Sequence, residues 1–134
     1  MESLKKKWIL LLSVIIVVLG MTSACQSEAK HDEMEDMIDV KAKISSNPAK
    51  VNEPIIFEAL VTQGDEKVTD AEMVDFEFYR KDGSDKEKLQ VSHQKNGTYR
   101  LEKSFSQEGT YYFISHVTAR GMHAMPKTEF KITK

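Results

Sequence analysis

From residue 38 to the C-terminus, apolar side chains recur at every second position, and this alternation limits the fold more than any other feature of the chain. The pattern is regular in residues 40–44 and 55–61, and it returns in residues 74–79. A period of two places successive side chains on opposite faces, which is typical of β-strands buried on one side. No stretch after Ile38 has a convincing helical period. We therefore expect an all-β domain over residues 38–134.

Turn-forming residues divide this region into short strands. Asn47-Pro48, residues 63–67, the charged residues 81–86 and Asn96-Gly97 all interrupt the alternation. The strands are expected at residues 38–44, 55–61, 74–79, 89–91, 99–105, 109–117 and 130–132. Short strands with turns every 8–12 residues or so are typical of an antiparallel β-sandwich of immunoglobulin-like type, here with about seven strands.

Most aromatic residues stand at the alternating positions that also hold aliphatic side chains, so they should face inward and form the core of this sandwich. Each could bury about 150–250 Å², which is enough for one core without a disulfide. His93 follows Leu89 and Val91 at a spacing of two, so it should point to the same face of the strand as they do. We therefore expect it to be a core histidine at a strand end rather than a ligand. The aromatic residues in question are Phe57, Phe76, Phe78, Tyr99, Phe105, Tyr111, Phe113 and Phe130.

The first 24 residues have the pattern of an export signal. Lys5-Lys6-Lys7 precede an apolar run over residues 8–19 that only Ser13 interrupts, and small residues follow. The run is shorter than the ~20 residues of a membrane-spanning helix. An uncleaved anchor is the alternative, because Gly20-Met21 would lengthen the run. We expect a signal peptide at residues 1–24.

Cys25 is the only cysteine, and it directly follows Thr22-Ser23-Ala24. This stretch resembles the lipobox of bacterial lipoproteins, although Thr22 stands where leucine is commonest. The resemblance implies that the sulfur is acylated and that Cys25 becomes the first residue of the mature chain. The acyl chains would then hold the protein on the extracytoplasmic face of the lipid bilayer, at about 0.8 kcal/mol per buried methylene. The alternative is a secreted protein with a free, reactive thiol.

Residues 25–37 are polar and acidic, which predicts a flexible tether between the anchor and the sandwich. His31, Met34 and Met37 lie three residues apart within it and are candidates for an auxiliary soft-metal site, although a solvated spacer is the interpretation we favour. Cleavage before Cys25 leaves 16 basic against 20 acidic side chains, a formal charge of −4. The chain has no basic patch with interleaved aromatic residues, so nucleic acid is not an expected partner.

The stretch from His116 to Met125 concentrates soft donor side chains. Imidazole and thioether groups suit Cu(I) and are poor ligands for Mg²⁺ or Ca²⁺. If a turn is centred between residues 120 and 121, His116 faces Met125 and Thr118 faces His123. His116, His123 and Met125 then share the face directed away from the core, and a slip of one residue would separate them.

Met122 is expected in the turn itself, as a fourth ligand to the same ion. The alternative is that the methionine and histidine side chains of this stretch fill the open end of the core. No Ser-His-Asp order, phosphate-binding glycine loop or pair of carboxylates in an expected pocket is present, so we expect no enzyme.

These features together resemble the YtkA-like (FixH-like) domain family over residues 38–133. The resemblance is carried by Cys25, by the Gly97-x-Tyr99, Phe105 and Gly109-x-Tyr111 spacing, and by the closing residues 122–126. It implies a small extracytoplasmic lipoprotein associated with copper handling and cytochrome oxidase maturation. The His123-x-Met125 pair is also similar to one in periplasmic copper chaperones, whose further ligands have no counterpart identified in this chain.

The hypothesis from the sequence is therefore a membrane-anchored lipoprotein that binds Cu(I) and passes it to a membrane oxidase or its assembly factors. The alternative hypothesis is a non-catalytic interaction module of the cell envelope that binds no metal and docks through an exposed strand edge.

Overall fold

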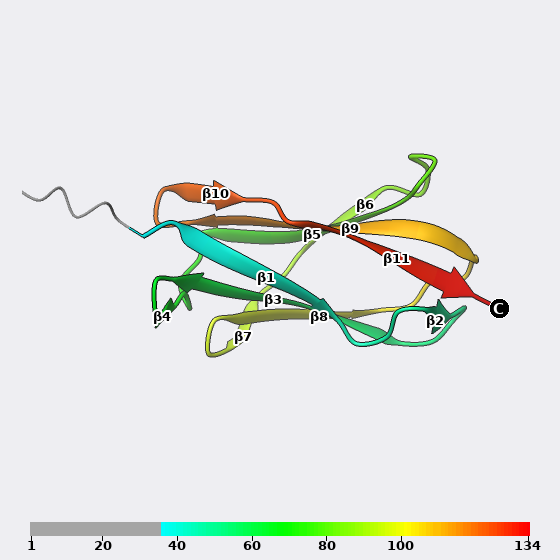
Figure 1. Ribbon diagram of the computed structural model, residues 1–134, viewed down its shortest axis with the longest axis horizontal. Helices are drawn as coiled ribbons and strands as arrows, with labels where there is room; N and C mark the ends of the chain where they lie inside the picture. Colours follow the sequence, from blue (N-terminus) through cyan, green and yellow to red (C-terminus); the bar gives the residue numbers. More distant parts are fainter. Residues whose placement is uncertain (1–35) are drawn as a thin grey trace, which may run out of the picture. The chain divides into compact units, whose positions relative to one another are not determined.

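The computed structural model describes residues 36–134, which form two β-sheets packed face to face (Figure 1). The expected all-β sandwich is confirmed. Within residues 36–134, no helix is long and apolar enough to cross a membrane. The predicted signal peptide, Cys25 and most of the predicted tether lie outside the described residues.

The first sheet has the order β1-β3-β8-β7, with β4 paired to the end of β3. All of its pairs are antiparallel. These strands are β1 (Ile38–Ile44), β3 (Ile55–Gln63), β4 (Glu66–Lys67), β7 (His93–Lys95) and β8 (Thr98–Lys103).

The second sheet has the order β2-β11-β9-β5-β6, with β10 paired to β9 beyond the end of β11. Its pairs are antiparallel except for β2 and β11, which run parallel. These strands are β2 (Ala49–Lys50), β5 (Met73–Arg80), β6 (Glu87–Gln90), β9 (Gly109–Ala119), β10 (Met122–Ala124) and β11 (Lys127–Thr133). The long strands match the predicted ones closely, and β2, β4 and β10 are too short to show an alternation of their own.

The strand predicted at residues 89–91 is the exception, because the chain changes sheets there. Leu89 belongs to β6 at the edge of the second sheet, whereas His93 begins β7 at the edge of the first. Val91 is buried between them, and its N–H donates to the carbonyl of Val74 at 2.8 Å. His93 is half-buried and accepts a hydrogen bond from the N–H of Gly97 at 3.0 Å, so it holds a turn rather than filling the core.

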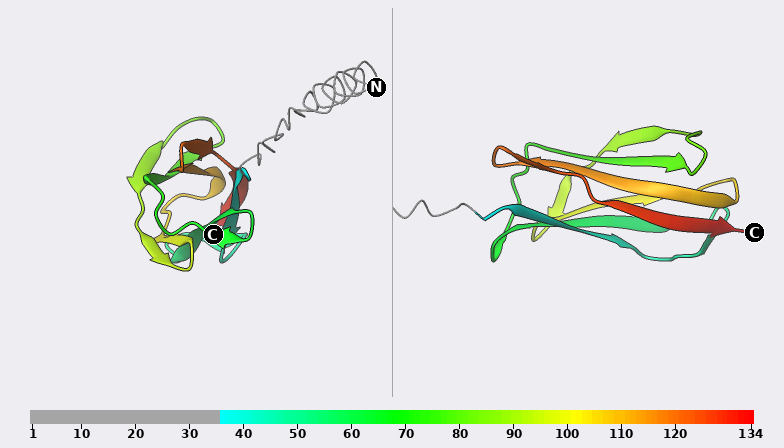
Figure 2. Two further views of the ribbon diagram at one scale, coloured as in Figure 1. Left: turned by 90° about the vertical axis from the view of Figure 1, so that its left-hand side faces the viewer. Right: turned by 45° about the horizontal axis from the view of Figure 1, so that its top comes forward.

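Phenylalanine rings from both sheets fill the space between the layers. Phe57 of β3 is fully buried and meets three rings of the opposite sheet edge-on, with centroids 4.7 Å away for Phe78, 5.0 Å for Phe113 and 5.3 Å for Phe130. Offset and edge-to-face contacts are the favoured geometry for aromatic pairs. Aromatic rings therefore pack the interior, so residues that act on solutes must lie on the outer faces or at the ends of the sandwich. Figure 2 shows the two layers of strands from two further directions.

Candidate metal centre

The hairpin formed by β9 and β10 has the register expected from the sequence. His123 pairs with Thr118 and Ala124 pairs with Val117, and Lys127 of β11 continues the same register opposite Ile114. This continuity places Met125 opposite His116. Pro126 has no N–H to offer the ladder, which separates β10 from β11, but its carbonyl accepts the N–H of Ser115 at 3.1 Å.

Residues 120 and 121 form the turn of this hairpin, and both have left-handed backbones, with φ of 53° and 71°. This conformation is the one that two-residue hairpin turns of type I′ require. Arg120 secures the turn: its N–H donates to the carboxylate of Glu72 at 3.0 Å, and its guanidinium donates to Gln63 at 2.7 Å. The same guanidinium donates to Glu66 at 2.7 Å, and this hydrogen bond lowers the pKa of the Glu66 carboxyl group.

The register brings two histidines together on the outer face of the second sheet. Val117 is fully buried, whereas His116 is half-buried and His123 is exposed. The centroids of the two imidazole rings lie 6.4 Å apart. Two imidazoles that ligate one ion at about 2 Å each have centroids roughly 5–6 Å apart, so the separation observed here is slightly longer than that of a ligating pair. Met125, opposite His116, is 55% exposed.

The other methionines named from the sequence are placed differently. Met122 opens β10 rather than lying in the turn, and it packs against the core on the face opposite His123. Because alternate residues of a strand point to opposite faces, the structure separates Met122 from the imidazole pair. Met37 is 72% exposed just before β1. His31 and Met34 lie outside the described residues.

No pattern in the sequence identifies Glu77, whose carboxylate hydrogen-bonds with His116 of the candidate site. Its Oε2 lies 2.7 Å from Nε2 of His116, and its Oε1 lies 2.9 Å from Nζ of Lys86. Glu77 is buried although it belongs to the outer face of β5, between the core residues Phe76 and Phe78. The alternation in β5 indicated that face, but no local pattern shows that β5 lies beside β9.

The pKa of Glu77 reflects two opposing effects. Burial favours the neutral acid, but the hydrogen bonds from Lys86 and His116 outweigh burial and lower the pKa below its ordinary value. The carboxyl group is therefore ionised at neutral pH and can only accept hydrogen bonds.

Hydrogen bonding selects one free nitrogen on each imidazole ring. Because the Glu77 carboxylate only accepts, Nε2 of His116 carries a hydrogen and Nδ1 remains open. In His123 the arrangement is reversed: Nδ1 is 2.9 Å from the hydroxyl of Thr118, which leaves Nε2 open. Metal-binding histidines usually have their second nitrogen held by such a partner, which fixes the tautomer and the ring orientation. In residues 36–134, no three His, Cys, Asp or Glu side chains are grouped to hold a metal ion.

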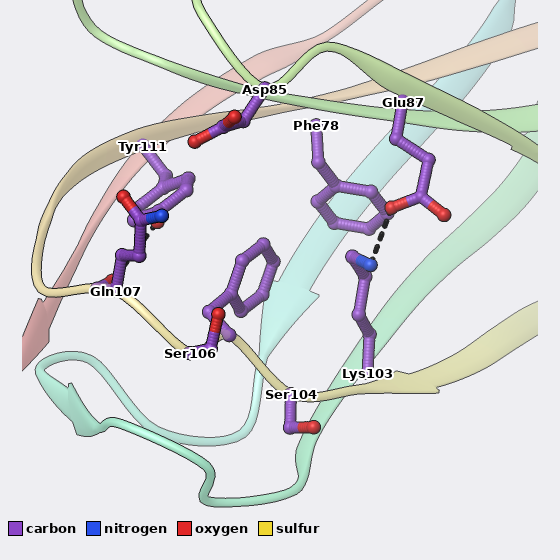
Figure 3. Close-up of a pocket in the computed structure, with 9 residues that line it drawn as sticks. Phe78, Asp85, Glu87, Lys103, Ser104, Ser106, Gln107 and Tyr111 are labelled. Atoms are coloured by element: carbon purple, nitrogen blue, oxygen red, sulfur yellow. Dashed lines mark hydrogen bonds and ion pairs between the residues drawn. The ribbon is translucent and has the colours of Figure 1, made fainter.

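A separate pocket of about 210 Å³ lies near the loop after β8 (Figure 3). Phe78, Phe105 and Tyr111 supply its aromatic wall, and Lys103 forms an ion pair with Glu87 at 2.5 Å. Nζ of Lys103 also lies 5.2 Å from the centre of the Phe105 ring. No histidine or methionine lines this pocket, so it is distinct from the candidate metal centre.

The fold and this site define a β-sandwich domain that presents a histidine pair on the outer face of one sheet. A family model described as YtkA-like matches residues 32–116, more than half of the chain, and the chain belongs to this family. The matched residues end at His116, before β10 begins. No protein of curated function matches the chain.

Three solved structures are similar to this chain at low sequence identity. An engineered protein is 16% identical with a TM-score of 0.54, over 72% of this chain but only 20% of its own. The soluble domain of PmoD from Methylocystis sp. is 14% identical with a TM-score of 0.47, over 73% of this chain and 92% of its own. A superoxide reductase (neelaredoxin) from Ignicoccus hospitalis is 13% identical with a TM-score of 0.45, over 74% of this chain and 82% of its own. The engineered protein supports the sandwich fold alone.

Proposed function

We propose that this protein binds Cu(I) through His116, His123 and Met125, and that it holds copper for transfer to another protein. One observation carries the proposal. The two imidazole rings lie 6.4 Å apart on an outer face, and each has one nitrogen occupied by a neighbour and the other free. The nitrogens that we propose as ligands, Nδ1 of His116 and Nε2 of His123, are the ones that Glu77 and Thr118 leave open.

The choice of Cu(I) follows from the softness of the donors. Two neutral imidazoles need further ligands, and the nearest residue with a soft donor on the same hairpin face is Met125. Thioethers and imidazoles favour Cu(I) over Mg²⁺, Ca²⁺ or Mn²⁺. The proposed set contains no thiolate, so the ion could move to a recipient that offers cysteine ligands. This behaviour suits a carrier and requires no catalysis by the protein itself.

The sequence supports a proposed location for this activity at the extracytoplasmic face of a membrane. The apolar run over residues 8–19 and Cys25 would export the chain and anchor it by acyl groups to the extracytoplasmic face of the membrane. The acidic residues 25–37 would act as a tether that lets the sandwich move above the bilayer surface while its anchor stays in the membrane. A membrane oxidase or its assembly factors are the recipients we propose, as the resemblance to the YtkA-like family implies.

A competition titration tests the proposed copper site. The purified protein is titrated with Cu(I) against a chromophoric chelator, and we expect a Kd below micromolar. His123→Ala should weaken binding by at least tenfold, because it removes one of two nitrogen donors. His93→Gln is the matched control, since His93 lies in β7 of the other sheet and should leave the affinity unchanged.

Micromolar or weaker binding that is unaffected by His123→Ala would contradict the proposal. The family assignment and the fold would stand in that case, and a metal-free interaction module would become the better description.

A further inference from the structure

Strand pairing places a methionine from β5 beside the candidate site. Thr118 of β9 is paired with His123 on one side and with Met73 of β5 on the other. The next outward-facing residue of β9, His116, lies between Met125 and Asp75. Met73 is therefore the diagonal neighbour of His116, although 43 positions separate them in the sequence.

The side chain of Met73 is on the correct face. Its neighbour Val74 is buried in the core, so alternation directs Met73 outward, where it is half-buried. Only the small side chain of Thr118 stands between Met73 and His123 along this row. Adjacent strands lie about 4.8 Å apart, so a flexible methionine side chain can reach across Thr118 toward the imidazoles. Diagonal neighbours such as Met73 and His116 are about 7–8 Å apart, which is also within reach.

The carboxylates near the imidazoles already have partners of their own. Asp75, which is paired with His116, lies 3.3 Å from Nζ of Lys88, and Glu77 accepts from His116 and Lys86. The outward-facing side chains that remain next to the histidines include two thioethers, Met125 on one side and Met73 on the other. Met122 points inward and is excluded from this set.

We propose that Met73 supplies a second thioether, so that the site binds a soft monovalent ion with two nitrogen and two sulfur donors. This inference rests on the proposed copper site and adds a ligand from a different strand. Four soft donors from β5, β9 and the segment 123–125 would surround the ion, and Cu(I) or Ag(I) is the ion that such a set selects. The site would then depend on the pairing of β5 with β9 as well as on the hairpin.

Two measurements on the full-length protein test the inference. The first is the Cu(I) affinity of Met73→Leu, a substitution that nearly conserves volume and should leave thermal unfolding almost unchanged. We expect at least a fivefold loss of affinity, whereas the matched variant Met122→Leu should change the affinity less than twofold. The second is an NMR spectrum of ¹³C-methyl-labelled methionine on addition of Ag(I). The methyl groups of Met73 and Met125 should shift, and that of Met122 should not.

The outcomes separate this inference from the proposed function. If His123→Ala weakens binding while Met73→Leu has no effect and the Met73 methyl signal stays in place, Met73 is not a ligand and the three-donor site remains. If the wild-type protein binds neither Cu(I) nor Ag(I) in a His123-dependent manner, the proposed function and this inference are both wrong. A fivefold loss together with a shift of the Met73 methyl signal establishes the second thioether.

Discussion

At the scale of single residues, the hydrogen bond to Glu77 orients the imidazole ring of His116. Glu77 is a buried carboxylate on an outer face, and the groups facing it are His116 from β9, Lys86 from the loop before β6 and Lys88 from β6. Burial alone would favour protonation, but the two hydrogen-bonded partners keep Glu77 ionised. Nε2 of His116 therefore donates to Glu77, and Nδ1 is the nitrogen that we propose as a ligand.

Glu77→Gln should make the stability of the protein less dependent on acidity. The folded-state pKa of Glu77 is lowered, so its contribution to stability is complete above the ordinary value of 4.5 and is lost as the pH falls through the folded-state pKa. The wild-type protein should therefore be more stable than the variant at pH 6, and the difference should shrink toward pH 3. Urea unfolding at a series of pH values measures it. A constant difference across this range would contradict the role assigned to Glu77.

At the scale of elements, the β9–β10 hairpin depends on the left-handed backbone of its two turn residues. Both turn residues have positive φ, and only the second is a glycine. The left-handed conformation of Arg120 is unfavourable for a residue with a side chain. Hydrogen bonds stabilise it here: the backbone N–H donates to Glu72, and the guanidinium donates to Gln63 and Glu66. These contacts fix the register on which the pairing of Thr118 with His123 depends.

Gly121→Ala should destabilise the hairpin locally. A Cβ at residue 121 meets no atom within 4 Å, so the expected cost of about 1 kcal/mol comes from the left-handed backbone alone. Hydrogen exchange should become faster at the amides of β10 than at those of β3 and β8. Gly83→Ala is the control, because Gly83 also has a positive φ and open space but lies in the loop between β5 and β6. Equal acceleration of β10 exchange in both variants would show that the turn has no local effect.

At the scale of the whole molecule, Phe57 makes the most aromatic contacts from the first sheet to the second. Phe57 of the first sheet contacts Phe78, Phe113 and Phe130 of the second, and residues 36–134 contain no cysteine that could join the layers by a disulfide. The stability of the sandwich therefore rests on aromatic packing across the interior, and the outer face of β5 and β9 can carry polar groups without weakening the core.

Phe57→Ala should lower the free energy of unfolding by about 3–5 kcal/mol, because it removes a fully buried ring and leaves a cavity between the sheets. Chemical denaturation monitored by circular dichroism provides the value. Met37→Ala is the control at an exposed position and should change the stability by less than about 0.5 kcal/mol. A loss below roughly 1 kcal/mol for Phe57→Ala would mean that the core can close around the vacancy.

The sequence by itself determined the features that depend on neighbouring residues. The alternation in residues 38–44, 55–61, 74–79 and 109–117 located the long strands, because side-chain direction in a strand changes with every residue. The turn at residues 120–121 was assumed rather than located, and the structure confirms the pairing of Thr118 with His123 that follows from this assumption. Where the pattern was short, as at residues 89–91, it could not show that the chain passes from one sheet to the other.

Only the tertiary structure decided which strand lies beside the histidines. Glu77 is 39 residues from His116 in the chain, and Met73 lies farther still, so no local period relates them. The pairing of β5 with β9 depends on how the two sheets bury their aromatic residues against each other. Only the assembled core determines that packing. The same packing turned Met122 inward and placed Met73 on the outer face beside Thr118, and for this reason the donor set that we propose draws on β5 as well as on the hairpin.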